Sequence, residues 1–514
     1  MKIQWVTPVV AVILVWGTSP LFAQSGSSPL ISEIQAQRHG LTRAWFAQVQ
    51  MDSHRDRIQS LRLHYDLPLS DDDEKGRKAA EEPAAEKLDP SIANLEDHGV
   101  LIVQTKQGVV QLLDALTGKS IWTVHVESNK ATSIPAISRD LVAVTRGSSL
   151  HIYKRDDGSL IWTKRVNRGP GAGTAISGSY VFVATTSGIV NVYDLEEKGQ
   201  PPWEYHSKGH GFVQPFATPA SVSWGTDFGK FFVLDLQKLG PRFPAIETQD
   251  EIVAQPAYIA PNFYVGSRDG FLYKIHEKQG TEAWRFSTGE PIEHTPVAVD
   301  GFIFLTTLHG GLYCVVGDVN VVGHAFAKAR KAAADRGEEV PKTERKWEEG
   351  EEVWWTPGIA KVLAVTPTRV YGLDDFGHTR ILRRDTGQLI DTMHTQNQSL
   401  SLINRATDRI YLGTKSGLIQ CLHEPAIEKP LKYMITSPVN GGPSEIEQGE
   451  AAEDGEKPGD DGGDQQQTED LFSGDDDRPE DDDSGEDNLF DDAPSDDEPA
   501  DEEATDESDD ENPF

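Results

Sequence analysis

Short runs of β-branched and aromatic residues recur through the middle of the chain, and each begins at a glycine. Examples are GVVQLLD from Gly108, GIVNVYD from Gly188 and GLIQCL from Gly417. The glycines that begin the runs are Gly108, Gly147, Gly188, Gly229, Gly270, Gly310, Gly377 and Gly417, separated by 39, 41, 41, 41, 40, 67 and 40 residues. Alternating apolar runs bounded by Gly, Asp and Ser predict antiparallel strands joined by tight turns.

Each repeat contains three further runs of strand character. One run precedes the glycine, as in LVAVT and YVFVATT; another contains a tryptophan, as in IWTVHV and IWTKRV; and several repeats open on a proline, as in IPAI and QPAY. Four strands per repeat and eight repeats predict an all-β fold, an eight-bladed β-propeller of four-stranded blades over residues 41–430. Alternation with period two excludes a solenoid of helix pairs, and no Trp-Asp dipeptide occurs in the chain.

The N-terminal strand is expected to close the ring. The eighth repeat has no tryptophan strand of its own, whereas residues 41–51 read LTRAWFAQVQM and place Trp45 in the pattern of the other repeats. A strand supplied from the N-terminus would complete the eighth blade and leave no gap between first and last blades. Residues 57–65 would then form the inner strand of blade one. The alternative is a disordered leader that merely contains a tryptophan.

The stretch LLDALTGKSIW, residues 112–122, is the clearest copy of a turn followed by a tryptophan. Glycine gives such a turn its backbone freedom, and a large indole ring can be buried against the adjacent blade. We therefore interpret the motif as structural, a device that docks one blade on the next. The predicted docking residues are Trp45, Trp122, Trp162, Trp203, Trp284, Gly118, Gly158 and Gly280. Phe243 in blade four and Asp391 in blade seven occupy the corresponding tryptophan positions.

These repeats resemble the quinoprotein-like propellers, a family with PQQ-like repeats that includes quinone-dependent alcohol dehydrogenases and BamB-type assembly propellers. LLDALTGKSIW resembles the family repeat closely, whereas YKRDDGSLIW (153–162) and KIHEKQGTEAW (274–284) resemble it in part. The resemblance covers roughly residues 41–425 and implies the fold. It implies no particular activity, because one fold supports many functions.

Two segments interrupt the repeats. Residues 67–91 are charged and poor in large apolar side chains, which predicts a loop inserted in blade one. Residues 318–355 account for the longest step and contain HAFAKARKAAAD, in which Phe326, Ala329 and Ala333 share one helical face. We expect an amphipathic helix at the rim of the ring. This helix is expected either to pack against its own blade or to bind a partner protein.

The N-terminus has the order of a secretory signal, with Lys2, an apolar run and SPLFAQ before a cleavage point after Ala23. Residues 1–23 are thus predicted to be a signal peptide and 24–40 a linker. The mature protein would be periplasmic or secreted, or anchored in the membrane if the signal stays uncleaved. No later apolar run is long enough for a transmembrane span.

Charge is concentrated at the C-terminus. Residues 441–514 contain 33 Asp and Glu against Lys457 and Arg478, which is 2 − 33 = −31 of the formal net charge of −35. Residues 431–514 are predicted to be an acidic disordered tail, because they lack the apolar content for a core. The tail contains the short apolar motifs DLF, NLF and NPF, which are either docking motifs for a partner or the result of chance spacing. The remaining body has no basic stripe, so we expect no nucleic-acid partner.

Catalytic chemistry finds little support in the sequence. By resemblance, the enzymes of this family hold pyrroloquinoline quinone with adjacent cysteines, a calcium ion and an Asp base. This chain has only Cys314 and Cys421, which fall in blades six and eight and are too distant to bridge. Neither lies near residue 23 to take the lipid that BamB-type proteins usually carry. We name no catalytic, cofactor-binding or metal-binding residue.

The main hypothesis is a non-catalytic scaffold, a monomeric ring without cofactor that binds envelope or secreted proteins. Its surface would be the channel mouth or the rim with the inserted helix. Residues near the starts of inner strands, Thr174, Gln255 and His294, are the candidates for the mouth. The alternatives are a quinone- and calcium-dependent dehydrogenase of alcohols or sugars, and a BamB-type outer-membrane assembly factor.

Overall fold

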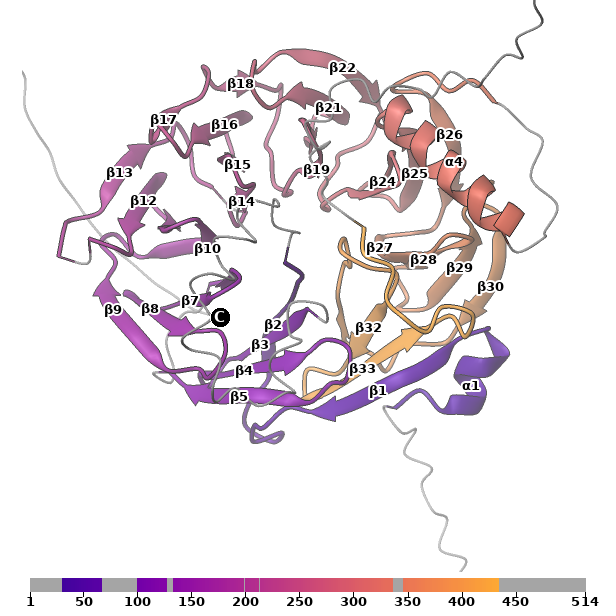
Figure 1. The fold of residues 1–514 in the computed structure, drawn as a ribbon, viewed down its shortest axis with the longest axis horizontal. Helices are drawn as coiled ribbons and strands as arrows, with labels where there is room; N and C mark the ends of the chain where they lie inside the picture. Colours follow the sequence, from indigo (N-terminus) through magenta and orange to yellow (C-terminus); the bar gives the residue numbers. More distant parts are fainter. Residues whose placement is uncertain are drawn as a thin grey trace, which may run out of the picture. The chain divides into compact units, whose positions relative to one another are not determined.

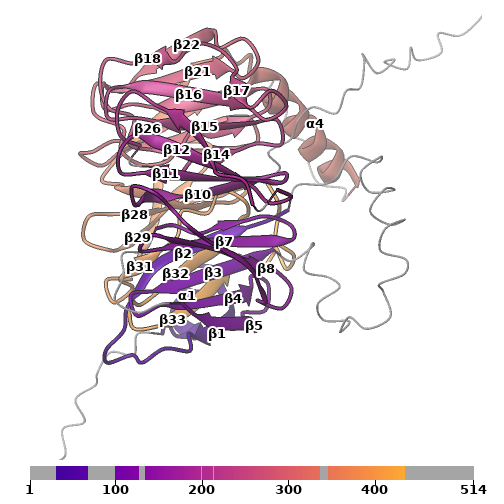
Figure 2. The ribbon, with the colours of Figure 1, turned by 90° about the vertical axis from the view of Figure 1, so that its left-hand side faces the viewer.

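The computed structural model describes residues 30–66, 99–126, 133–197, 199–211, 213–335 and 345–433. The strands of these residues form eight antiparallel sheets arranged as blades around a common axis (Figure 1). The side view shows strands such as β16 (Lys230–Asp235) and β10 (Pro170–Ser177) running across the thickness of the ring (Figure 2). The predicted eight-bladed propeller is confirmed.

Each blade runs from an inner strand near the axis to an outer strand at the rim. Blade one consists of β2 (Ile58–His64), β3 (Val100–Thr105), β4 (Val109–Asp114) and β5 (Ser120–His125). Blade two consists of β6 (Ala136–Ile137), β7 (Leu141–Arg146), β8 (Ser149–Lys154) and β9 (Leu160–Arg165). Blade three consists of β10 (Pro170–Ser177), β11 (Tyr180–Thr185), β12 (Ile189–Asp194) and β13 (Trp203–His206).

Blade four departs from the four-stranded plan. It contains β14 (Phe216–Ala217), β15 (Ser221–Gly225), β16 (Lys230–Asp235) and β17 (Gly240–Pro241), and β18 (Ile246–Glu247) also pairs with β16. Two short strands thus share the outer edge of β16, where other blades have one.

The remaining blades return to four strands. Blade five consists of β19 (Ala257–Ile259), β20 (Asn262–Gly266), β21 (Phe271–His276) and β22 (Glu282–Ser287). Blade six consists of β23 (Val297–Val299), β24 (Phe302–Thr306), β25 (Gly311–Val316) and β26 (Glu352–Pro357). Blade seven consists of β27 (Lys361–Val365), β28 (Arg369–Leu373), β29 (Thr379–Arg383) and β30 (Leu389–Met393).

The N-terminal strand closes the ring, as the sequence predicted. Blade eight consists of β31 (Leu400–Ser401), β32 (Ile410–Gly413), β33 (Leu418–His423) and, on the outside, β1 (Thr42–Gln48). β1 pairs with β33 and brings Trp45 opposite Cys421. The last blade is therefore built from both ends of the propeller sequence.

The second and third strands of each blade are buried on both faces, because neighbouring blades cover both. All residues of β3 are buried, for example, whereas the outer strand β5 alternates between buried and exposed positions. Sheets covered on both faces give near-continuous apolar runs, and half-covered strands alternate. This explains why the strongest runs in the sequence come from the middle strands.

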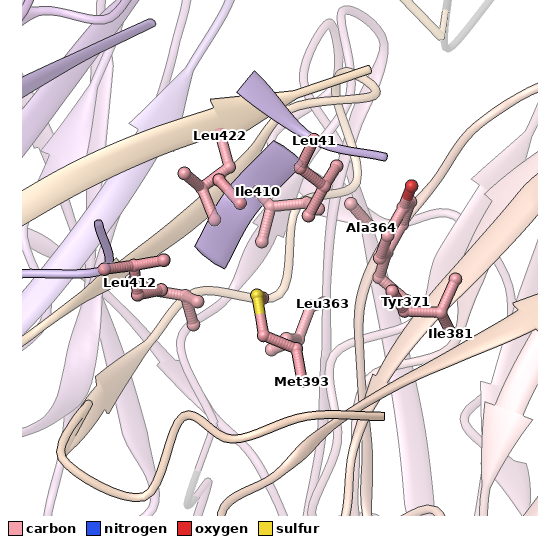
Figure 3. Close-up of a cluster of buried hydrophobic side chains, with 11 residues drawn as sticks. Leu41, Leu363, Ala364, Tyr371, Ile381, Met393, Ile410, Leu412 and Leu422 are labelled. Atoms are coloured by element: carbon pink, nitrogen blue, oxygen red, sulfur yellow. The ribbon is translucent and has the colours of Figure 1, made fainter. Parts of the chain in front are cut away.

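The segment before β1 is part of the core. One buried cluster contains Ile31, Ala36 and Leu41 together with the blade-seven residues Leu363, Tyr371 and Met393. Figure 3 shows Leu41 and the blade-seven residues of this cluster. Residues 24–40 are therefore more than the predicted linker, since they contain the helix α1 (Glu33–Arg38) and these buried contacts. The side chain of Ser32 caps α1 by accepting a hydrogen bond from the backbone nitrogen of Gln35 at 3.1 Å.

The insertion in blade six contains the helix α4 (Val319–Asp335). Its first turn packs on the blade, since Val322 is buried and lies against Gly301. Phe326, by contrast, is 48% exposed. The outer strand β26 already begins at Glu352, before the predicted end of the insertion at residue 355.

Several predicted segments lie outside the described residues. They are the signal peptide 1–23, the loop 67–91 and, apart from residues 431–433, the acidic tail 431–514. No helix among the described residues is long and apolar enough to cross a membrane.

Candidate functional site

Three tryptophans on outer strands lock their blade to the next one. Trp45, Trp122 and Trp354 are each less than a tenth exposed. Each indole nitrogen donates a hydrogen bond to a backbone oxygen in the next blade: Trp45 to Ala115 at 3.0 Å, Trp122 to Arg155 at 2.6 Å and Trp354 to Arg384 at 2.8 Å. A buried indole N–H needs such an acceptor. These contacts join blade eight to one, one to two, and six to seven.

The turn glycines lie directly under these rings. A Cβ atom at Gly118 would overlap the ring of Trp45, and one at Gly158 would lie 2.7 Å from the ring of Trp122. Gly280 is covered in the same way by Phe243, which takes the place of a tryptophan in blade four. The backbone φ angles of Gly118, Gly158 and Gly280 are 71°, 69° and 67°, in the left-handed region that favours glycine. These glycines are thus needed for backbone conformation and for space.

Trp162 and Trp284 are only partly buried. The ring of Trp162 meets Tyr193 of blade three edge-on, with the ring centres 5.9 Å apart. Trp284 lies over Gly350 of blade six, but its buried indole nitrogen has no hydrogen-bond partner. Both rings contact the next blade without the hydrogen bond seen at Trp122.

Trp203 differs from the expectation, because its side chain is 42% exposed. Trp122 lies opposite Leu112 and Trp162 opposite Ile152, and in both ladders a β-bulge shifts the register next to this pair. β12 and β13 pair without a bulge. A bulge turns a side chain away from its regular direction. Pro201 and Pro202 precede Trp203 and carry no backbone N–H for pairing, so the strand begins at the tryptophan itself. Tyr205 packs against Trp224 of blade four instead, with ring centres 5.4 Å apart.

Blade seven is docked by an ion pair instead of a ring. Asp391 Oδ2 lies 2.6 Å from Nδ1 of His39, the residue that ends α1. Burial raises the pKa of Asp391, but the hydrogen bonds from His39 and the Thr392 backbone and nearby positive charge together outweigh it, so the pKa is lowered. The segment before β1 therefore also closes the contact between blades seven and eight.

Near the axis, buried polar side chains connect blades two to five. Gln214 donates from Nε2 to Thr174 O at 2.6 Å and to Pro135 O at 3.1 Å, and Gln255 donates to Gln214 O at 2.8 Å. Thr174 is fully buried and donates to Ala143 O at 3.3 Å. Thr174 and Gln255, predicted at the channel mouth, are therefore interior links between blades. Backbone carbonyl groups that are buried away from water need such hydrogen-bond donors.

Arg405 extends this connection across the axis. It lies in the turn between β31 and β32 of blade eight, yet its Nη2 donates to Gln255 Oε1 at 3.0 Å and its Nη1 to Pro256 O at 3.3 Å. Its guanidinium also lies over the ring of Phe216, 5.6 Å from the centre. Blades four and five are opposite blade eight in a ring of eight. One arginine thus ties the two halves of the ring together.

His294, the third mouth candidate, is partly exposed, although its Nδ1 is buried without a hydrogen-bond partner. Burial and the positive charge of Lys361 lower the pKa of His294, and Glu293 opposes them only in part. Of the three candidates, His294 alone keeps surface open to solvent.

One face of the ring carries exposed apolar side chains. Antiparallel blades place the turn between second and third strands at the same end as the connection to the next blade, and the two are bonded, as in Leu308 N to Pro291 O at 2.9 Å. We call these turns and connections together the connection face. Phe228, Leu308 and Phe376 occupy the turns of blades four, six and seven and are 68%, 45% and 75% exposed.

Comparison with known proteins identifies the type of propeller. The family model described as outer membrane protein assembly factor BamB matches residues 106–240. The outer membrane protein assembly factor BamB of Shewanella oneidensis is 23% identical over 222 residues, 42% of this chain and 47% of that protein. The match therefore spans about half the length of this curated relative. The crystal structure of BamB from Moraxella catarrhalis aligns with a TM-score of 0.51 and 16% identity over 74% of this chain and 97% of that one.

The protein is a BamB-like β-propeller with PQQ-like repeats. The resemblance drawn from the repeat motif is confirmed at this level. The solved structure supports the fold of the whole ring, whereas the family model covers residues 106–240, in blades one to four.

Among the described residues, the two cysteines do not form the adjacent pair that a quinone site of this family would use. Cys314 on β25 and Cys421 on β33 are both buried and free, in different blades. Among the described residues there is also no group of three or more His, Cys, Asp or Glu side chains able to hold a metal ion. These described residues do not fit the quinone and its calcium.

The sequence missed two residues of this site. Trp354 follows the long insertion, where the period of about forty breaks. The sequence WWTP around it and the later Gly387 were signals that could have indicated a docking tryptophan there. Arg405 lies in an ordinary polar turn, NRATDR, that carries no signal of a contact with residues about 150 positions earlier.

Proposed function

We propose that this BamB-like propeller is an exported, non-catalytic scaffold that binds another envelope protein through its connection face. The supporting observation is the exposure of Phe228, Leu308 and Phe376 at equivalent turns of three blades. Exposure of large apolar side chains to water is unfavourable, and a bound partner would remove these three from it. Turns tolerate polar residues at these positions, as Lys415 and Ser416 show in blade eight. The ring does not need apolar side chains there.

Capture from an envelope extract tests this face. The full-length protein is compared with a triple variant, Phe228→Ser, Leu308→Ser and Phe376→Ser. The matched control replaces apolar side chains of similar exposure on outer strands, Phe46→Ser and Leu160→Ser, which are 56% and 55% exposed. A partner lost by the triple variant and retained by the control supports the proposal. Equal capture by both variants contradicts it.

The rim with α4 is the competing surface. A variant that replaces residues 323–344 by a short Gly-Ser linker keeps the buried Val322 and the strand β26. If this variant alone loses the partner, the binding surface is the rim and not the connection face. If no specific partner is captured by any version, the scaffold function is wrong.

Export is part of the proposal. The chain would be cleaved after Ala23 and reside in the periplasm or outside the cell, or stay anchored through an uncleaved signal. Cell fractionation and N-terminal sequencing of the mature protein distinguish these locations. Light scattering of the purified protein tests whether the ring, closed by its own N-terminal strand, is a monomer.

A narrower form of the proposal is a role in outer-membrane protein assembly. It is supported by the names of the relatives, while the absence of a cysteine near residue 23 to take a lipid argues against it. Loss of the protein would then lower the amounts of outer-membrane proteins in the cell. Unchanged amounts would limit the proposal to a different envelope partner.

The quinone-dependent dehydrogenase remains the alternative from a different class. It predicts a bound chromophore on addition of pyrroloquinoline quinone and calcium-dependent dye reduction with alcohols or sugars. Either result would replace the scaffold function by an enzymatic one.

A further inference from the structure

Three cationic residues lie on consecutive blades of the closed ring. Lys361 begins β27 of blade seven, Arg405 lies in the turn before β32 of blade eight, and Arg62 lies on β2 of blade one. β2 and β27 are among the strands closest to the centre in Figure 1. These are three consecutive blades of the closed ring, and the side chains of all three residues are partly accessible to solvent.

These cations have no acidic partner within the described part of the chain. Lys361 donates to the hydroxyl of Ser401 at 3.1 Å, and Arg405 bonds only to the neutral oxygens of Gln255 and Pro256. Among the residues that the structure describes, the side chain of Arg62 has no hydrogen bond or ion pair. The contrast is with Arg155, which is buried between the blades and donates to both carboxylate oxygens of Asp66, at 2.8 and 2.7 Å.

The positive charge of Arg62 disfavours the charged form of Arg405. Burial lowers the pKa of Arg62 to about 10. Burial and the positive charge of Arg62 together lower the pKa of Arg405 to about 10. Enclosed like charges without a counter-ion are unfavourable, and an anion bound between them would relieve both effects.

We propose that Arg62 and Arg405 form a binding site for a small oxyanion, a phosphate or carboxylate group of a ligand. A guanidinium group presents its N–H donors in a planar fork that matches two oxygens of such a group. Arg405 is already held in place by Gln255 and Phe216, whereas the guanidinium group of Arg62 meets no acceptor among the described residues. The site is separate from the connection face and adds a ligand to the scaffold.

Isothermal titration calorimetry on the full-length protein tests the site, in a buffer free of phosphate and carboxylates. Inorganic phosphate and citrate are titrated separately, because they distinguish the two sources of oxyanion. Saturable binding of either supports the proposal. We expect Arg62→Gln and Arg405→Gln to weaken it by about tenfold or more, the loss of a charged hydrogen bond. Arg62→Lys should retain part of the affinity, and Arg38→Gln, at an exposed position of α1, should retain all of it.

The stability of Arg62→Gln without added anion separates binding from a structural role. A residue kept for a ligand leaves the free protein equally or more stable when its unpaired charge is removed. Lower stability of this variant in anion-free buffer would mean that Arg62 is structural. That result, the absence of saturable binding for both probes, or equal affinity in Arg62→Gln would overturn the proposal.

Discussion

The indole ring of Trp45, on the N-terminal strand, lies directly against Gly118 in the first complete blade. Its nitrogen donates to Ala115 O of the same turn at 3.0 Å. The two residues are 73 positions apart and form the contact at which the ring closes. Closure thus uses the same combination of ring, glycine and carbonyl oxygen that docks blade one on blade two.

Gly118→Ala should destabilise the propeller, because the new methyl group would overlap the Trp45 ring and strain a φ of 71°. Overpacking costs about 1–3 kcal/mol and the backbone conformation about 1 kcal/mol more. The control is Gly289→Ala, which has the same φ of 71° but nothing within 4 Å of the added atom. Urea unfolding of both variants measures the difference. Equal losses would mean that the contact with Trp45 is unimportant.

Trp122→Ala should be much more destabilising than Trp203→Ala. The first ring is 7% exposed and hydrogen-bonded to Arg155 O, whereas the second is 42% exposed. Truncating a buried tryptophan costs about 3–5 kcal/mol, and exposed positions usually cost under about 1 kcal/mol. Thermal unfolding of the two variants gives the comparison. A large loss for Trp203→Ala would show that blade three docks through this ring after all.

Acid should remove the stability that Asp66 provides. Burial alone raises the pKa of Asp66, but His64 and Arg155 more than compensate and lower it from 3.8 to about 2. The folded pKa is below the unfolded one, so the stabilisation is complete above about pH 4 and is lost as the pH falls towards 2. It amounts to roughly 2 kcal/mol.

The control for this prediction is Asp66→Asn, measured by chemical unfolding from pH 2 to pH 7. The stability difference between the wild type and this variant should shrink as the pH falls through the window. Other carboxylates titrate in both proteins and cancel in the difference. A difference that stays constant with pH would exclude the pairing with Arg155 as its cause.

The two thiols should be unreactive in the folded protein. Cys314 and Cys421 are 2% and 1% exposed, and burial raises the pKa of Cys421 to about 12 and that of Cys314 further. Thiolates are the reactive species, and none would form at neutral pH. Titration with a thiol reagent should detect almost no thiol in the native protein and two after denaturation. Rapid labelling of the native protein would show that blades six and eight open in solution.

The repeat pattern was sufficient to predict the ring, because each blade is a local antiparallel unit with its own alternating strands and turn glycines. Closure by the strand around Trp45 was also predictable, since the tryptophan missing from the eighth repeat stands at the other end of the pattern. Trp203 matched the same pattern but is exposed, because the prolines before it prevent the bulge that turns the other rings inward.

The sequence alone therefore determined the number of blades, their strands and the positions where rings and glycines meet, since these features depend on residues close together in the chain. Only the tertiary structure decided what lies at the axis. Arg405 bonds to Gln255, and the charge of Arg62 lowers the pKa of Arg405, because the inner strands of all eight blades converge there. Such neighbours come from repeats far apart in the chain, and no local pattern records which side chains share that space.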